Sequence, residues 1–189
     1  MRVISGSARR LPLVTPKGLN TRPTSDKVKE TLFNILAPYL YDANVLDLFA
    51  GSGAIGIEAL SRGSRHCTFI EKDKDALNCI RKNLEKTRFT EKATVYQADV
   101  LSRLPALSSG PFDLIFMDPP YNMELEKKVL GIIADMGICA DDALIVVEAA
   151  SDTDLSYATE LGYEAVKVKD YKNSKHVFFK NLSDHNIRR

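Results

Sequence analysis

The sequence has no tryptophan, only three cysteines, and no apolar run that approaches the length of a membrane span. Cys67, Cys79 and Cys139 are far apart and form no C-x-x-C pair, so they suggest neither a disulfide framework nor a zinc site, and we expect no metal. The opening MRVISGSARR carries charges without the apolar segment of a signal peptide behind them. These absences predict a cytoplasmic protein that does not contact a membrane.

The chain also lacks the length for two full domains. Its 189 residues suffice for one complete core. We expect a basic β-hairpin and helix over residues 1–40, packed on a main domain over residues 41–189. We expect this protein to be a monomer.

A strong net charge is missing as well, because the formal value is only +1. The charges are distributed unevenly, however: residues 1–30 carry +5 and residues 165–189 carry +5, which leaves about −9 for the segment between them. Basic ends on an acidic body suit a polyanion bound at one surface. Ordinary solvated faces explain the charges equally well, so this pattern leaves both interpretations open.

The most informative stretch is residues 45–63, VLDLFAGSGAIGIEALSRG. An apolar run breaks at Gly51, Gly53 and Gly56 and resumes with helical spacing, which predicts a strand, a tight turn and a helix. Glu71 follows at the separation of an acid that binds ribose hydroxyls. This G-x-G-x-x-G pattern indicates a nucleotide-type ligand; by itself it does not distinguish NAD from S-adenosylmethionine, and a glycine turn without a ligand is the alternative.

Strands and helices alternate after this point, as in a doubly wound α/β domain. The expected strands cover residues 45–49, 67–71, 93–96, 112–117 and 144–148, and the expected helices end near Gly63, begin at Asp73 and include residues 125–133. A further helix is expected from Thr24 or Ser25 to about Tyr39.

The end of the chain departs from strand–helix repeats. Residues 163–168 and 176–179 are β-rich and are separated by a polar turn too short for a crossover helix, so we expect an antiparallel hairpin. A parallel sheet with such a hairpin resembles the plan of S-adenosylmethionine-dependent methyltransferases.

A second motif, Asp118-Pro119-Pro120-Tyr121, follows the strand expected at 112–117. The two prolines fix the backbone and donate no N–H, which leaves carbonyl oxygens and the Asp118 side chain as acceptors. Acceptors of this kind bind an amino group, and Tyr121 adds a flat face on which a base can stack. The alternative is a rigid turn in which Tyr121 is ordinary packing.

These motifs resemble those of amino-methyltransferases that act on the exocyclic nitrogen of a base. More specifically, RVISGSARR at residues 2–10 and PKGLNTRPTSDKVKETLFNIL at residues 16–36 resemble the RsmD family, which methylates a guanine N2 of bacterial 16S ribosomal RNA. The likeness covers nearly the whole chain. It implies S-adenosylmethionine as cofactor and 16S ribosomal RNA as partner, within the small subunit or an assembly intermediate.

The resemblance also implies a role for each matching residue. Asp47, Phe49 and the turn from Gly51 to Gly53 would hold the amino-acid end of the cofactor. Glu71 would accept the ribose hydroxyls, and Asp99 would meet the adenine amino group. The second motif, Asp118, Pro119, Pro120 and Tyr121, would hold the reacting amino group. Apart from the resemblance, Arg9, Arg10 and Arg22 are our candidates for contacts with RNA phosphates near the mouth of the site.

The expected reaction is a direct displacement in which the amino nitrogen attacks the methyl group, without a metal or a covalent intermediate. Asp118 and the Pro119 carbonyl would accept the amino hydrogens and favour the positive charge that develops on the nitrogen. With the ordinary pKa of an aspartate, Asp118 would be a weak proton acceptor. The target base has to be unstacked to enter such a pocket.

Three other functions compete with this interpretation. An NAD-dependent dehydrogenase would need a substrate domain, and the three histidines, at positions 66, 176 and 185, look structural or solvated rather than catalytic. A non-catalytic RNA-binding module fits the basic ends but leaves the second motif unexplained. A DNA adenine or cytosine amino-methyltransferase shares the chemistry, although it would usually carry a target-recognition segment.

Overall fold

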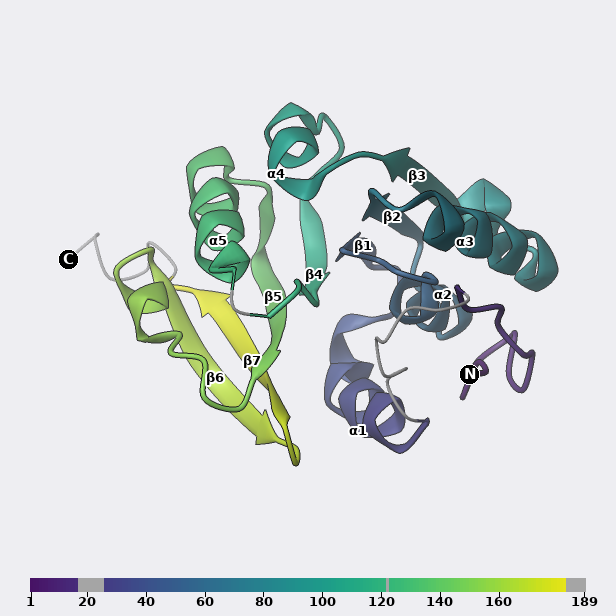
Figure 1. Ribbon diagram of the computed structural model, residues 1–189, viewed down its shortest axis with the longest axis horizontal. Coiled ribbons are helices and arrows are strands. Elements are labelled where there is room, and N and C mark those ends of the chain that lie inside the picture. Colours follow the sequence, from purple (N-terminus) through teal and green to yellow (C-terminus); the bar gives the residue numbers. More distant parts are fainter. Residues whose placement is uncertain (17–25, 122, 183–189) are drawn as a thin grey trace.

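The protein is built on one seven-stranded sheet with the strand order β3-β2-β1-β4-β5-β7-β6 (Figure 1). The computed structural model describes residues 1–16, 26–121 and 123–182. The strands are β1 (Asn44–Leu48), β2 (His66–Glu71), β3 (Ala93–Gln97), β4 (Phe112–Met117), β5 (Cys139–Ala150), β6 (Tyr163–Asp170) and β7 (Ser174–Asn181).

The first five strands are parallel, and β7 joins antiparallel to both β5 and β6. The central strands consist mainly of apolar residues and are buried on both faces, as parallel strands between two helix layers require. The predicted doubly wound sheet with a C-terminal antiparallel hairpin is thus confirmed.

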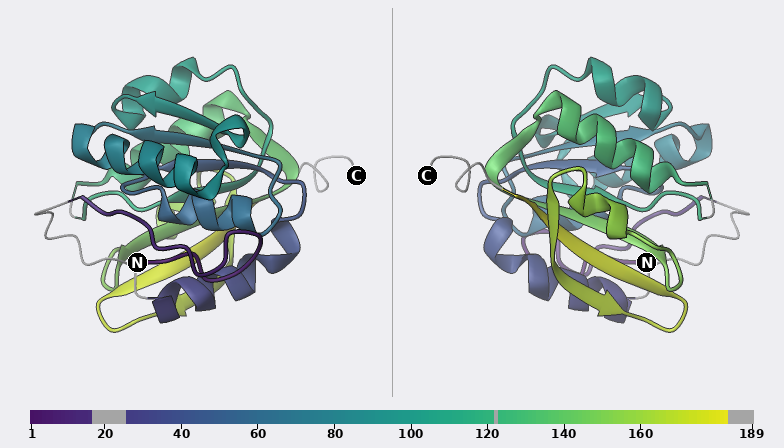
Figure 2. Two further views of the ribbon diagram at one scale, coloured as in Figure 1. Left: turned by 90° about the vertical axis from the view of Figure 1, so that its right-hand side faces the viewer. Right: turned by 90° about the vertical axis from the view of Figure 1, so that its left-hand side faces the viewer.

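Helices cover both faces of the sheet (Figure 2). The α-helices are α1 (Asp26–Leu36), α2 (Ala54–Ser61), α3 (Lys74–Thr87), α4 (Val100–Arg103) and α5 (Leu125–Met136), and the short 3-10 turns are Ala37–Tyr39, Thr90–Lys92, Leu104–Ala106 and Ser156–Thr159. One hydrophobic core joins the sheet to α1, α2 and α3, and a second joins it to α4 and α5. Of the helices in the described ranges, none has the length and apolarity that crossing a membrane requires.

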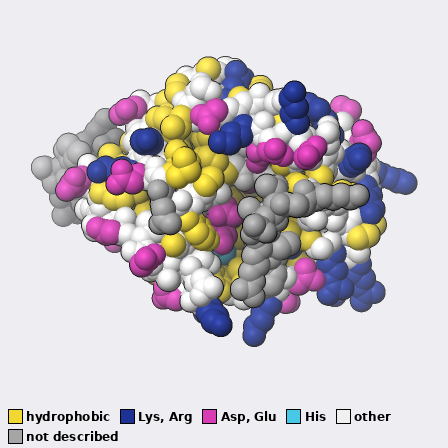
Figure 3. All heavy atoms as spheres, in the orientation of Figure 1, with side chains coloured by type: hydrophobic (Ala, Val, Ile, Leu, Met, Phe, Trp, Pro, Cys, Tyr) yellow, Lys and Arg dark blue, Asp and Glu magenta, His cyan; other side chains and the backbone are white. Residues whose placement is uncertain are grey.

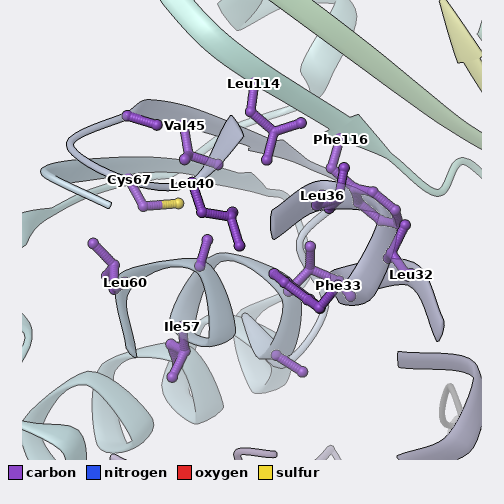
Figure 4. Close-up of a cluster of buried hydrophobic side chains, with 14 of the residues drawn as sticks. Leu32, Phe33, Leu36, Leu40, Val45, Ile57, Leu60, Cys67, Leu114 and Phe116 are labelled. Atoms are coloured by element: carbon purple, nitrogen blue, oxygen red, sulfur yellow. The ribbon is translucent and has the colours of Figure 1, made fainter. Parts of the chain in front are cut away.

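The apolar stripe of α1 packs directly on the sheet. Leu32, Phe33 and Leu36 are fully buried, and they lie beside Leu114 and Phe116 of β4 (Figure 4). Their spacing of one, three and four residues places them on one helix face, which explains why this segment folds against the sheet.

The N-terminal segment is fastened to α2 by a buried cluster of charges. Glu58 accepts hydrogen bonds from the backbone N–H groups of Ile4 and Ser5, at 2.8 and 2.9 Å, and forms ion pairs with Lys29 at 3.2 Å and with Arg62 at 2.9 Å. The side chains of Lys29 and Glu58 are fully buried. The first forty residues therefore share a core with the sheet, and the division at residue 40 stays a prediction.

Two elements differ from the sequence-based expectation. Helix α4, directly after β3, was not predicted, because its four residues are too few to show a helical period; it begins where the Asp99 side chain accepts a hydrogen bond from the Leu101 N–H at 3.0 Å. Strand β5 begins five residues before the predicted start, since exposed Asp141 and Asp142 interrupt the apolar run without ending the strand.

Candidate active site

The glycine turn between β1 and α2 lies at the carboxyl end of the parallel strands, where open α/β sheets bind ligands. Phe49, Gly51 and Gly53 all have positive φ, at 58°, 55° and 74°. A Cβ added to Gly51 would meet no atom within 4 Å, so the backbone there faces open space. A ligand can therefore approach the backbone of the turn closely, but the Gly51 and Gly53 N–H groups donate to Glu71 and to the Ala50 carbonyl, so the bare N–H groups expected from the sequence are not found at these two glycines.

Close packing under the turn depends on Gly56. A Cβ at this position would lie 2.3 Å from Phe69 Cε1 and 2.5 Å from Cys67 Sγ, so α2 approaches β2 more closely than any side chain allows. The Gly56 N–H donates to Asp47 Oδ2 at 3.0 Å. Asp47 therefore ties the first turn of α2 to β1.

Asp47 is also a buried ionisable residue. Its side chain is almost fully enclosed, and burial raises its pKa to about 8; the negative charges of Glu71 and Asp118 add to the shift, whereas the hydrogen bond from Gly56 opposes it. A nearby cation would favour the ionised form.

Glu71, at the end of β2, links two loops. Its Oε2 accepts the Gly51 N–H and its Oε1 accepts the Asp73 N–H, both at 2.8 Å. The carboxylate thus holds the glycine turn beside the start of α3, and its remaining lone pairs are available to a ligand. This bracing role was not predicted from the sequence.

Asp99, at the end of β3, is exposed and caps α4 through Oδ1. The family resemblance implied that Asp99 binds the adenine amino group. In the structure, one of the two carboxylate oxygens of Asp99 is used to cap α4. The cofactor role of Asp99 stays a prediction.

The Asp118-Pro119-Pro120-Tyr121 motif begins directly after β4, as predicted. Asp118 is partly exposed, and burial together with the negative charge of Glu148 raises its pKa to about 8. Pro119 is buried, Pro120 is exposed, and the Tyr121 hydroxyl is hydrogen-bonded to Ser174 of β7. Tyr121 is 41 % exposed, so its ring is accessible to a ligand.

A second hydrogen-bonded group lies next to this motif. His176 of β7 donates from Nε2 to Glu148 Oε2 of β5 at 2.9 Å, and its Nδ1 lies 3.2 Å from the Tyr171 hydroxyl. His176 is fully buried and Glu148 is nearly so. The signal that could have found Glu148 was its place at the end of a predicted parallel strand, the same criterion that selected Glu71.

Four acids converge on one face of the sheet. Asp47 pairs in register with Phe69 and Phe116, and Phe116 pairs with Val146. Because side chains alternate along a strand, the acids two residues beyond these partners share the face of Asp47. They are Glu71, Asp118 and Glu148. Figure 3 shows acidic side chains gathered in the hollow near the middle of this view, beside a histidine. Such a cluster favours a cationic ligand.

The predicted phosphate-binding arginines lie elsewhere. Arg9 and Arg10 are exposed, and the adjoining backbone N–H groups of Ser7 and Ala8 bond to Ser61, at the far end of α2 from the glycine turn. At 1.5 Å per residue, that helix separates them from the turn by about 12 Å. The structure therefore does not bring these two arginines to the glycine turn. Arg22 lies outside the described residues.

Exposed Lys172 lies closer to the motif. It belongs to the turn between β6 and β7, two residues from Ser174, the partner of Tyr121. The sequence showed this lysine as part of the basic C-terminal segment but gave no reason to place it beside the motif.

Comparison with known proteins assigns the chain to a family. The model of the family described as "Conserved hypothetical protein 95" matches residues 1–180. The Ribosomal RNA small subunit methyltransferase D of Escherichia coli (strain K12) is 41 % identical over 155 residues, which cover 82 % of this chain and 77 % of that protein. The Haemophilus influenzae protein of the same name is 40 % identical over 159 residues, covering 82 % and 81 %.

Solved structures agree with this assignment. An Escherichia coli structure assigned as the methyltransferase yhhF superposes with a TM-score of 0.83 and 36 % identity, over 97 % of this chain and 98 % of that one. A Thermus thermophilus protein superposes with a TM-score of 0.79 and 27 % identity, over 94 % and 98 %. The chain therefore belongs to the RsmD family and has its methyltransferase fold, for which S-adenosylmethionine is the cofactor.

Proposed function

We propose that this protein transfers a methyl group from S-adenosylmethionine to the exocyclic N2 amino group of a guanine in 16S ribosomal RNA, within the small subunit or an assembly intermediate. The observation that carries this proposal is the Asp118-Pro119-Pro120-Tyr121 motif beside the glycine turn, on the same sheet edge. The names of the two relatives, both small-subunit ribosomal RNA methyltransferases, support the choice of RNA.

The residues at this edge fit the cofactor chemically. S-adenosylmethionine supplies a methyl group on a positively charged sulfur. The acids around Asp47 and Asp118 suit that charge, and the open backbone at Gly51 suits the close approach of a ligand. We assign the amino-acid end to the turn that contains Phe49, Gly51 and Gly53, with Asp47 beneath it. The ribose belongs to Glu71 and the adenine to Asp99.

The second motif would hold the target base. The amino group of the base donates its hydrogens to Asp118 and to the Pro119 carbonyl, while the ring of the base stacks on Tyr121. Acceptors at these positions stabilise the positive charge that develops on the nitrogen as it gains the methyl group. A proton then leaves the nitrogen.

Asp118 is a better acceptor for this proton than the sequence suggested. Burial and the charge of Glu148 raise its pKa to about 8, instead of the ordinary value of 3.8 on which the sequence-based expectation rested. A general base works best when its pKa is near the operating pH. In the free protein this carboxyl is largely protonated at neutral pH, so Asp118 serves as the base after the positively charged sulfur of the bound cofactor has favoured its ionised form.

The test is transfer of labelled methyl groups to unmethylated small subunits, naked ribosomal RNA and duplex DNA, followed by nucleoside analysis. We expect N2-methylguanosine from one or both ribosomal substrates. Asp118→Asn should lose methyl transfer while still binding cofactor in calorimetry. Asp152→Asn, the same change at an exposed position, should keep both methyl transfer and cofactor binding. Label in DNA alone would refute the RNA substrate, and cofactor binding without any transfer would favour an RNA-binding module.

A further inference from the structure

Glu148 and His176 form a hydrogen-bonded polar pair where the neighbouring strand pairs are apolar. Between β5 and β7, Ile145 pairs with Phe179 and Val147 with Val177, so apolar contacts hold the hairpin on the sheet. One step further, Glu148 pairs with His176. Burying a carboxylate costs several kcal/mol, which its contacts at best offset, so stability alone does not explain why a carboxylate stands between these two strands.

The position of this pair points to the reacting base. Met117 and Val147 are neighbours in register, so Asp118 and Glu148, each one residue further along, lie side by side and share a face near the carboxyl ends of β4 and β5. The charges of both residues also act on the Tyr121 phenol, which is bonded to Ser174, two residues before His176. Asp118, Tyr121 and Glu148 therefore lie near one another at this edge of the sheet.

The hydrogen bonds around Glu148 leave it able to bind a ligand. His176 Nε2 is hydrogen-bonded to Glu148 Oε2. On the other side of the imidazole ring, His176 Nδ1 is hydrogen-bonded to the Tyr171 hydroxyl, and this contact fixes the orientation of the ring. Within the described ranges, no hydrogen bond to Oε1 is found. The side chain of Glu148 is 12 % exposed, so this oxygen belongs to a carboxylate fixed in place yet accessible at the surface of the site.

Paired acceptors at this place discriminate between bases. The Watson–Crick edge of guanine presents two adjacent donors, the N1–H and the N2 amino group. Adenine and cytosine present an amino group beside a bare ring nitrogen, which is an acceptor. A second carboxylate next to Asp118 therefore attracts guanine and repels the other two bases, and a flipped base is read along this edge.

We propose that Glu148, held by His176, is the specificity-determining residue that accepts the N1–H of the target guanine while Asp118 accepts its N2 amino group. This inference rests on the proposed function and deepens it. In the complex, Glu148 contacts the base, and His176 is a positioning residue that acts through Glu148.

The test uses small subunits reconstituted on ribosomal RNA in which the guanosine found by nucleoside mapping is replaced by 2-aminopurine riboside. This analogue keeps the 2-amino group but has a bare N1. Wild-type protein should methylate guanine at least about 100-fold more efficiently, because a site built to bind a hydrogen-bond donor rejects an analogue that lacks it.

Glu148→Gln should reduce that preference to below about 10-fold, since the amide can donate to the bare N1 as well as accept from N1–H. Glu164→Gln, the same change at an exposed position of β6, should leave the preference unchanged. The analogue also lacks the guanine carbonyl, and a shift in preference caused by Glu148→Gln assigns the effect to N1.

His176→Gln should lower the preference as well, whereas His66→Gln, at the opposite end of the parallel strands, should not. Cofactor binding by calorimetry confirms that each variant is folded. If the wild type methylated guanine and 2-aminopurine with equal efficiency, the proposal would be wrong. It would also be wrong if Glu148→Gln and His176→Gln each lowered methylation of the two bases by the same factor. Absence of guanine methylation in the wild type would instead refute the proposed function and this inference with it.

Discussion

Asp118 is expected to make the protein less stable at the pH at which it works. Burial and the charge of Glu148 raise its pKa to about 8, so the folded protein keeps a proton on this carboxyl at neutral pH. The unfolded chain has released that proton above about pH 5, because the ordinary value is 3.8. Asp118→Asn removes the titrating group and should therefore stabilise the fold as the pH rises.

The size of the effect follows from proton linkage. Where the folded state binds one more proton than the unfolded state, the free energy of unfolding falls by about 1.4 kcal/mol per pH unit. Between pH 5 and pH 7, the stability of Asp118→Asn relative to the wild type should therefore increase by about 2.7 kcal/mol. Asp47, which also has a pKa of about 8, is present in both proteins. Its contribution largely cancels over this pH range, because Asp118 adds charge to the Asp47 site only when it is ionised.

Urea unfolding of both proteins, without cofactor, at half-unit steps from pH 5 to pH 7 measures this difference. Asp152→Asn is the control, because Asp152 is exposed; its stability relative to the wild type should stay within about 0.5 kcal/mol at every pH. A constant difference between Asp118→Asn and the wild type over this range would show that Asp118 is ionised in the folded protein. The raised pKa, on which the argument for efficient proton transfer by Asp118 rests, would then be wrong.

Three further predictions concern the glycine turn, the N-terminal segment and RNA binding. Gly56→Ala should cost about 1–3 kcal/mol in denaturant unfolding and weaken cofactor binding, because its Cβ would lie 2.3 Å from Phe69. Glu58→Ala should cost about 3–5 kcal/mol in the same assay, since it leaves Lys29 as an unpaired buried charge. If Lys172 contacts a phosphate, Lys172→Ala should reduce the slope of log affinity against log salt by about 0.7–0.9 in ribosomal RNA binding.

The sequence predicted the parallel core and its ligand-binding edge because both depend on local patterns. Apolar runs marked the strands, and Gly51, Gly53 and Gly56 marked the turn between β1 and α2. Acids at the ends of β2 and β4, Glu71 and Asp118, could be selected for the same reason, since parallel strands bring their carboxyl ends to one edge.

The sequence could predict where the site residues lie along the sheet edge, but not which side chains surround each of them. The raised pKa of Asp118 depends on the charge of Glu148, thirty residues further along the chain but on the adjacent strand. The resemblance implied the adenine role of Asp99. An acid directly after a strand also suits a helix cap, so the sequence could not distinguish the two roles. Arg9 and Arg10 were assigned to the mouth of the site from charge alone, without the contacts to Ser61 that place them at the other end of α2.

The C-terminal hairpin shows how an addition to the sheet can extend the chemistry of its edge. β7 runs antiparallel to β5, so its start, and not its end, lies at the carboxyl edge of the parallel strands. His176 and Ser174 come from that start, and they bind Glu148 and Tyr121 respectively. A parallel strand in the same position would bring its end to this edge instead. The reversal of direction therefore lets residues near the chain terminus support both sides of the proposed base pocket.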